Sequence, residues 1–241
     1  MPKKAGGTMY GICIGGYIPT SFLDFPGSAA AVVFLKGCQF RCPFCHNPEL
    51  VTPKGETDLI PAGQILDDFR KRKNFLDGVC ISGGEPTIQP GLLPFLDLIR
   101  AEDLKIKLDT NGARPDVLEQ VLASGKADYI AMDVKAPWEK YPLASGWDGN
   151  IESVKESISL LLGSKTAFEF RTTLVPGIHS LEDANPMGRM IEGVPLYVLQ
   201  NFRPGHTLSP EFSGRDPFPP EFLEAFRETA APFAGEVRIR G

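Results

Sequence analysis

Short apolar runs alternate with segments of helical periodicity over most of the chain. Six of these runs are bounded by turn-forming residues and have strand length, and they cover residues 29–35, 77–82, 104–109, 128–134, 167–175 and 195–202. Between them, apolar positions three and four residues apart predict helices at residues 62–75, 91–103, 115–125, 150–163 and 180–193. This alternation predicts an α/β protein with right-handed crossover connections and a parallel sheet.

Six strand–helix units are too few for a closed eight-stranded barrel. The predicted fold is therefore an incomplete, six-stranded parallel β/α barrel, with an open doubly wound sheet as the alternative. We expect three parts, which are a β extension in residues 1–28, the barrel core in residues 29–205, and a C-terminal helix and strand in residues 206–241 packed on the same domain. The last helix is expected near residues 218–230, followed by a short strand at EVRIR.

Composition and charge indicate the cellular compartment and exclude some classes of partner. The 241 residues carry 25 basic and 30 acidic side chains, a net charge of −5, so no general attraction to nucleic acid or to an anionic membrane is expected. No apolar run approaches the ~20 residues of a membrane span, and the start MPKKAGGTMYG lacks the apolar centre of a signal peptide. We therefore expect a cytoplasmic protein, in which clustered cysteines more often bind metal than form disulfides.

Three of the five cysteines lie close together directly after the first predicted strand, at Cys38, Cys42 and Cys45. A structural zinc site would need a fourth ligand such as His46, but the adjacent Cys45 and His46 rarely both reach one tetrahedral ion. A four-iron cluster takes thiolates, and three cysteines leave one iron open for a substrate or cofactor. The other two cysteines, Cys13 and Cys80, lie in apolar stretches and are expected to be buried structural thiols.

Glycine-rich and polar motifs follow the next three predicted strands. They are Gly83 and Gly84 after the second strand, Asp109 and Thr110 at the end of the third, and Asp133 and Lys135 at the end of the fourth. In parallel α/β folds, ligands bind beyond the C-terminal ends of the strands, so we expect these residues at the functional edge. Asp133 and Lys135 share one strand face, and a surface salt bridge is the structural alternative.

The fifth predicted strand carries Glu169 and Arg171 on one face. Charges that face a barrel interior are costly unless a polar ligand lies there. Arg171 is therefore assigned to a cofactor or substrate, and an internal Glu169–Arg171 pair is the alternative.

The cysteine spacing Cys-x3-Cys-x2-Cys, with Phe44 before the last cysteine, resembles the signature of radical S-adenosylmethionine (SAM) enzymes. The turn Ser82-Gly83-Gly84-Glu85-Pro86 resembles the GGEP motif of the same family, which binds the SAM amino group. This resemblance implies a 4Fe–4S cluster whose open iron is occupied by SAM. It also implies that Phe44, His46, Gly83 and Gly84 contribute to the SAM site.

The segments Leu108-Asp109-Thr110-Asn111-Gly112 and Met132-Asp133-Val134-Lys135 are similar to the DTNG and (M/L)DxK motifs of glycyl-radical activating enzymes. The similarity implies that Lys135 contacts the SAM carboxylate and that Arg171 helps to orient SAM. It further implies a monovalent cation bound by Asp109, Thr110 and Asp133. Phe202 stands where some relatives have a histidine near the ribose, and Asn201 is the substitute that we expect.

Residues 16–27 and the segment CHNPEL (45–50) resemble anaerobic ribonucleoside-triphosphate reductase activating proteins. The implied activity is reductive cleavage of SAM to methionine and a 5′-deoxyadenosyl radical, which takes hydrogen from a glycine of the partner enzyme. The implied electron donor is a small protein such as a flavodoxin or ferredoxin. The alternatives are an activator of the pyruvate formate-lyase type, a radical SAM enzyme for a small molecule, an iron–sulfur sensor and a zinc module.

Overall fold

The predicted apolar runs form the strands of a mostly parallel sheet. A computed structural model of the chain describes residues 11–51 and 59–240, so the start MPKKAGGTMY and the first residues of the predicted β extension lie outside the described residues. The strands are β1 (Ile14–Ser21), β2 (Ala30–Leu35), β3 (Gly78–Gly83), β4 (Lys105–Thr110), β5 (Tyr129–Asp133), β6 (Ala167–Leu174), β7 (Tyr197–Asn201) and β8 (Val237–Arg240).

Helices connect these strands much as the periodicity predicts. The α-helices are α1 (Pro48–Val51), α2 (Ala62–Arg72), α3 (Leu92–Arg100), α4 (Pro115–Ser124), α5 (Tyr141–Ser145), α6 (Glu152–Leu162), α7 (Ala184–Met190), α8 (Pro210–Ser213) and α9 (Pro220–Ala230). Short 3₁₀ turns are η2 (Pro86–Ile88), η3 (Trp138–Lys140), η4 (Leu181–Asp183) and η5 (Ala231–Phe233). The helix predicted at 180–193 is thus a 3₁₀ turn followed by α7. Among the described helices, none combines the length and the apolar character that a membrane span requires.

Strand order distinguishes the two predicted architectures. The strands follow one another in the sheet in chain order from β1 to β8, whereas a doubly wound sheet reverses its order at a switch point. The prediction of an α/β barrel-like fold is confirmed. The number of strands was too low, because β1 joins the sheet antiparallel to β2 and β8 joins it parallel to β7.

Two compact units divide the chain. Unit 1 comprises Met1–Cys38, Glu49–Thr110 and Asp116–Ile130, and unit 2 comprises Gln39–Pro48, Asn111–Pro115 and Ala131–Gly241.

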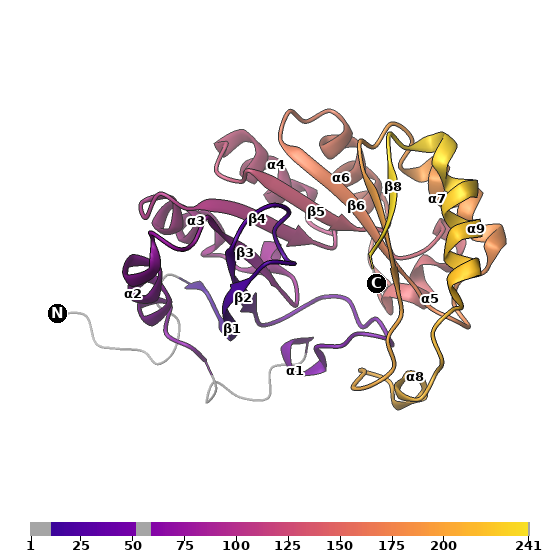
Figure 1. Cartoon of the computed structure of the whole chain (residues 1–241), viewed down its shortest axis with the longest axis horizontal. Helices are drawn as coiled ribbons and strands as arrows, with labels where there is room; N and C mark the ends of the chain where they lie inside the picture. The colour runs from indigo at the N-terminus through magenta and orange to yellow at the C-terminus, as the bar shows by residue number, and fades with distance from the viewer. Residues whose placement is uncertain (1–10, 52–58, 241) are drawn as a thin grey trace. The chain divides into compact units, whose positions relative to one another are not determined.

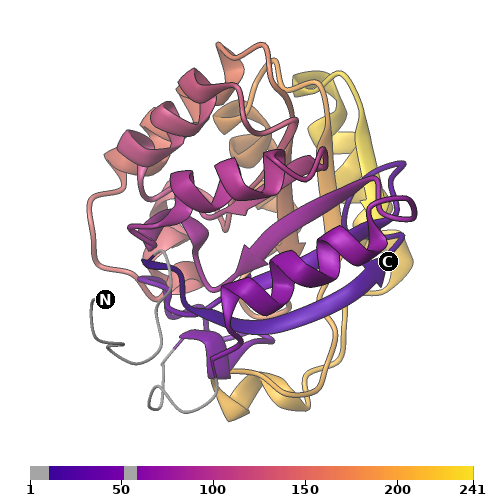
Figure 2. The same ribbon diagram turned by 90° about the vertical axis from the view of Figure 1, so that its left-hand side faces the viewer.

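In unit 1, strands β2, β3 and β4 are parallel, with Val33 opposite Ile81 and Ile81 opposite Leu108. Strand β2 is apolar along nearly its whole length because both of its faces are covered. Helices α2 and α3 lie on the same side of these strands (Figure 2). Helix α2 buries its residues 62, 65, 66 and 69, which is the spacing of a single helix face.

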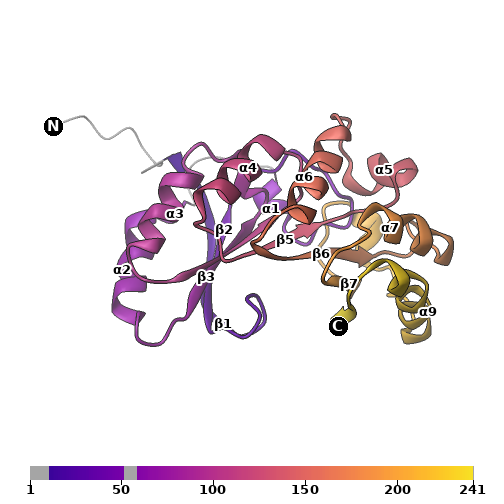
Figure 3. The same cartoon turned by 90° about the horizontal axis from the view of Figure 1, so that it is seen from above.

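In unit 2, strands β6, β7 and β8 are parallel, with Thr172 opposite Leu199 and Leu199 opposite Ile239. Helices α7 and α9 lie side by side next to β8 (Figures 1 and 3). Phe226 of α9 and Tyr197 of β7 are completely buried. The Tyr197 hydroxyl donates a hydrogen bond to Thr172 (2.8 Å), so the core satisfies this polar atom.

Candidate functional site

The clustered cysteines lie in the connection between β2 and α1, and this connection belongs to both units. Cys38 ends a segment of unit 1, whereas Cys42 and Cys45 belong to unit 2. All five cysteines fall within the described residues, and none forms a disulfide there. Cys80 is buried as predicted, but Cys13 is partly exposed because it lies just before the edge strand β1, so that prediction was wrong.

Backbone hydrogen bonds within unit 2 hold the part of the loop that carries Cys42 and Cys45. The Arg41 N–H donates to the Ser145 carbonyl (2.7 Å), and the Leu208 N–H donates to the Cys45 carbonyl (3.0 Å). Gly146 has a φ of +57°, and a Cβ at this position would overlap the Arg41 backbone. A glycine after α5 therefore lets the cysteine loop approach the end of this helix.

Gly83 and Gly84 pack against the end of β2 within unit 1. Gly83 has a φ of +121°, and a Cβ there would overlap the Leu35 backbone. A Cβ at Gly84 would overlap the Gly37 carbonyl and would lie 3.3 Å from the Cβ of Cys38. The glycines thus permit a close approach of two backbones and bring the GGEP turn beside Cys38.

Asp109 and Thr110, at the end of β4, have partners within unit 1. Asp109 forms an ion pair with Lys107, and its Oδ2 accepts a hydrogen bond from the Ser82 hydroxyl (2.9 Å). The Thr110 hydroxyl donates to the buried carboxylate of Glu85 (2.8 Å). Sequence reasoning missed Lys107, although its position two residues before Asp109 places both side chains on one strand face.

Asp133 binds two cationic side chains of unit 2. Its Oδ2 lies 3.0 Å from Nζ of Lys135, and its Oδ1 lies 2.9 Å from Nε of Arg171. Burial alone would raise the pKa of Asp133, but Arg171 and Lys135 outweigh burial and lower this pKa to about 2. Burial lowers the pKa of Lys135, whereas Asp133 and Cys42 raise it more, so the net shift is upward. Lys135 and Arg171 bring two cationic side chains to one place in unit 2, and charged donors of this kind bind carboxylates.

Cys42 and Tyr141 lie beside this charged group. Burial raises the pKa of Cys42 to about 11, although Lys135 opposes the shift. Burial also raises the pKa of Tyr141, and the charge of Lys135 opposes this shift. Within the described residues, the Tyr141 hydroxyl and Oε1 of Gln39 are buried without a hydrogen-bond partner. Such atoms cost about 1–3 kcal/mol each, so they fit a place where a polar ligand binds.

His179 connects the end of β6 to the backbone of Lys135. The Val175 N–H donates to Nδ1 of His179 (3.0 Å), so the ring proton lies on Nε2, which donates to the Lys135 carbonyl (2.9 Å). Burial lowers the pKa of His179 and keeps the ring neutral. Sequence reasoning treated His179 as isolated, because no local pattern indicates a contact across 44 positions.

Glu169 and Arg171 share a face of β6 but bind different partners. Both carboxylate oxygens of the fully buried Glu169 lie 2.8 Å from guanidinium nitrogens of Arg240 in β8. This bidentate pair neutralises Glu169. Arg171 extends instead to Asp133, in the same group as Lys135.

The residues near the end of β7 have mainly internal contacts. Phe202 is buried and stacks on the ring of His46, with 5.6 Å between ring centroids and 23° between planes. Phe44 is also buried. The Asn201 side chain donates to the Phe218 carbonyl (2.7 Å) and accepts from the Phe218 N–H (3.2 Å). Asn201 therefore ties β7 to the segment before α9, and a ribose would have to compete with this contact.

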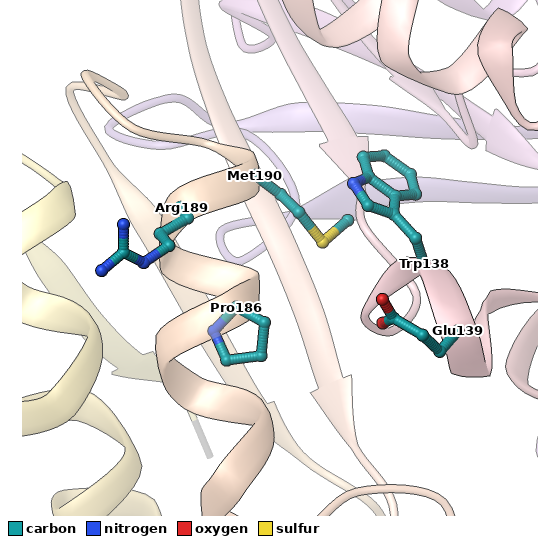
Figure 4. Close-up of a pocket in the computed structure, with 5 residues that line it drawn as sticks. All are labelled: Trp138, Glu139, Pro186, Arg189 and Met190. Atoms are coloured by element: carbon teal, nitrogen blue, oxygen red, sulfur yellow. The ribbon is translucent and has the colours of Figure 1, made fainter.

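A pocket of about 230 Å³ lies between η3 and α7 in unit 2 (Figure 4). Its lining residues are Trp138, Glu139, Pro186, Arg189 and Met190. The Arg189 guanidinium points away from Trp138 (Figure 4) and stacks on Phe233 at 5.6 Å. All five lining residues differ from the predicted cofactor residues, so this pocket does not mark the predicted site.

The thiol groups of the loop after β2 are the feature that supports an iron–sulfur site. Among residues 11–51 and 59–240, no group of three Cys, His, Asp or Glu side chains is arranged to hold a metal ion. The chain nevertheless supplies three thiols at iron–sulfur spacing in one connection, next to buried polar atoms that lack partners. These residues fit a cluster with one open iron.

Comparison with known proteins identifies relatives that span nearly the whole chain. A family model described as the radical SAM superfamily matches residues 32–183. A protein of Methanocaldococcus jannaschii, named as a candidate glycyl-radical enzyme activating enzyme, is 30% identical over 235 residues, covering 94% of this chain and 95% of that protein. A pyruvate formate-lyase-activating enzyme of Listeria monocytogenes is 27% identical over 230 residues, covering 89% and 91%.

Solved structures share the fold at low sequence identity. Streptococcus suis SuiB bound to S-adenosylmethionine has a TM-score of 0.64 at 14% identity, covering 85% of this chain and 48% of that one. The coproporphyrinogen III oxidase HemN from Escherichia coli has a TM-score of 0.57 at 18% identity, covering 83% and 50%. At these identities the likeness supports the fold alone.

Proposed function

The chain belongs to the radical SAM superfamily, and we propose that it generates a glycyl radical on a partner enzyme, specifically an anaerobic ribonucleoside-triphosphate reductase. Its cofactors are accordingly a 4Fe–4S cluster and SAM. The activating role rests on relatives named as activating enzymes that align over 94% and 89% of the chain. The resemblance of residues 16–27 and 45–50 to reductase activators supports the choice of partner.

In this proposal, Cys38, Cys42 and Cys45 hold the cluster. Bound together, the reduced cluster and SAM supply reductive cleavage of a sulfonium, which is the source of a carbon radical. The contribution of the chain is to hold SAM in place and to keep competing hydrogen donors away from the reacting atoms.

The two cationic side chains at Asp133 are the part of unit 2 that would bind the SAM carboxylate. Lys135 and Arg171 supply the charge, while Asp133 fixes both side chains through charge-assisted hydrogen bonds. His179 then acts as a positioning residue, because its ring holds the Lys135 backbone.

The remaining contacts follow from the motifs. The Gly83–Gly84 turn would offer backbone carbonyls to the SAM amine, since it has no Cβ atoms to block approach. Phe44 and the stacked pair of His46 and Phe202 supply apolar and aromatic surface of the kind that packs against an adenine ring.

The test uses cluster-loaded protein, a chemical reductant, SAM and the cognate reductase under anaerobic conditions. We expect a glycyl radical on the reductase by electron paramagnetic resonance, with 5′-deoxyadenosine formed in comparable amount. When the glycines of the reductase are deuterated, deuterium should appear in the 5′-deoxyadenosine, because the hydrogen comes from a glycine Cα.

A parallel reaction with a glycyl-radical enzyme of the pyruvate formate-lyase type separates the two classes of partner, since relatives of that type also align with the chain. A radical on that enzyme alone would assign the chain to it. SAM cleavage without a radical on either protein would contradict the activating function and favour a small-molecule substrate.

A further inference from the structure

A buried cation lies in β4, beside one of the residues expected to hold a monovalent cation. Lys107 is 2% exposed, and its ammonium forms an ion pair with Oδ1 of Asp109. Its Nζ also lies 3.7 Å from Sγ of Cys80, directly across the β3–β4 pair. A lysine is almost never buried to this extent unless its charge is paired, and Asp109 is the carboxylate that pairs it.

Both carboxylate oxygens of Asp109, which were expected to ligate a cation in unit 1, already have partners. Oδ1 of Asp109 receives Lys107, and Oδ2 receives the hydroxyl of Ser82 at 2.9 Å. The Lys107–Asp109 pair has no net charge, so a further cation at Asp109 would meet an ammonium of the same sign.

Asp133, the third expected cation ligand, also has a partner at each carboxylate oxygen, and both partners lie within unit 2. Oδ1 of Asp133 receives Arg171 at 2.9 Å, and Oδ2 receives Lys135 at 3.0 Å. The expected cation ligands therefore do not fit a free cation, because the chain itself supplies a cationic side chain to each carboxylate.

We propose that the Lys107 ammonium takes the place of the monovalent cation at Asp109, so that SAM binds to this chain without added K⁺ or Na⁺. An ammonium is a compact positive charge with three donors, and it satisfies oxygen atoms that would otherwise ligate a hard cation. The inference rests on the SAM site proposed above. It differs from the resemblance to activating enzymes, which implies a bound cation.

The test is calorimetric titration of SAM into cluster-loaded protein in KCl, NaCl or choline chloride at equal ionic strength. Choline is too large to serve as a ligated cation. For the unmodified chain, we expect dissociation constants within about twofold in all three salts. Lys107→Met should weaken SAM binding about tenfold in choline chloride, and KCl should restore it, because the vacated position then accepts K⁺.

Lys105→Met is the matched control, since Lys105 begins the same strand and is exposed. It should behave like the unmodified chain in every salt. A second readout is the thallium-205 resonance of Tl⁺, a K⁺ substitute, which should broaden with Lys107→Met but not with the unmodified chain.

Two results would overturn the inference while leaving the proposed SAM site in place. The first is SAM binding by the unmodified chain that weakens about tenfold when choline replaces K⁺. The second is a folded Lys107→Met variant whose SAM affinity is equal in all salts. If Lys107→Met fails to fold, the salt dependence of SAM binding to the unmodified chain tests the inference by itself. Absence of SAM binding in every salt would overturn the proposed site together with this inference, whereas tight binding without a glycyl radical would overturn only the activating function.

Discussion

Two lysine–aspartate pairs end consecutive strands of the chain, and each has a buried cysteine nearby. The Asp109 set of unit 1 consists of Cys80, Lys107 and Asp109, and the Asp133 set of unit 2 consists of Cys42, Lys135 and Asp133. In the first set the lysine precedes the aspartate by two residues, and in the second it follows by two residues. Both arrangements place the two side chains on one face of a strand.

The sets differ in the number of cationic side chains at the aspartate and in exposure. Lys107 is 2% exposed and its charge is balanced by Asp109. Arg171 joins Lys135 at Asp133, and the side chains of Lys135 and Arg171 are 17% and 15% exposed. A ligand from solution reaches partly exposed side chains more readily than the buried Lys107. We therefore expect the Asp133 set to contact SAM directly, whereas Lys107 acts through Asp109 from the interior.

The largest expected effect is loss of the cluster, and it distinguishes the buried Cys42 from the buried Cys80. Cys42→Ala should abolish the cluster, because a four-iron cluster with SAM on its open iron needs all three thiolates of the loop. Iron after anaerobic reconstitution should fall from about four per chain to background. Cys80→Ala is the matched control and should retain its iron. Equal iron content in the two variants would remove the distinction between the sets.

The next effect concerns the charge of Lys135. Lys135→Ala should weaken SAM binding about tenfold or more at unchanged iron content, since a charge-assisted hydrogen bond contributes roughly 1.5–3 kcal/mol. Calorimetry on cluster-loaded protein measures this change. Lys140→Ala is the control, because Lys140 pairs with Asp183 at 2.7 Å in the same unit. Unchanged SAM affinity in Lys135→Ala would reduce the Asp133 set to a structural ion pair.

The smallest effect concerns the support of Lys135 by His179. Burial lowers the folded-state pKa of His179, although the Lys135 carbonyl and Asp183 oppose the shift. The unfolded chain takes up a proton near pH 6.5 that the folded chain does not. The free energy of unfolding should therefore be highest above pH 6.5. It should decrease by at most about 1.4 kcal/mol per pH unit as the pH falls from there toward the folded-state pKa.

Urea unfolding between pH 5 and 8 measures this dependence. His179→Gln should flatten it, because the variant lacks the ring whose pKa is lowered in the folded chain. The same pH dependence in His179→Gln and in the unmodified chain would show that another group titrates.

The strands and their ends could be predicted because they depend on local patterns. Continuous apolar runs mark covered parallel strands, and helical spacing marks the segments between them. The motif residues Asp109, Asp133 and Lys135 were located at strand ends for the same reason. The motif of Cys38, Cys42 and Cys45 could be recognised from its spacing, because an iron–sulfur loop takes its ligands from one short segment.

The sequence by itself therefore determined the fold class, the cysteine motif and the strand-end residues. Each of these depends on a local pattern of residues that lie a few positions apart. Tertiary structure alone decided the partners of the buried charges: Arg240 for Glu169, Arg171 for Asp133 and the His179 ring for the Lys135 backbone. These partners come from distant strands and loops. A buried charge needs a counter-charge, but the sequence does not say which residue supplies it, because that depends on how distant strands come to face one another.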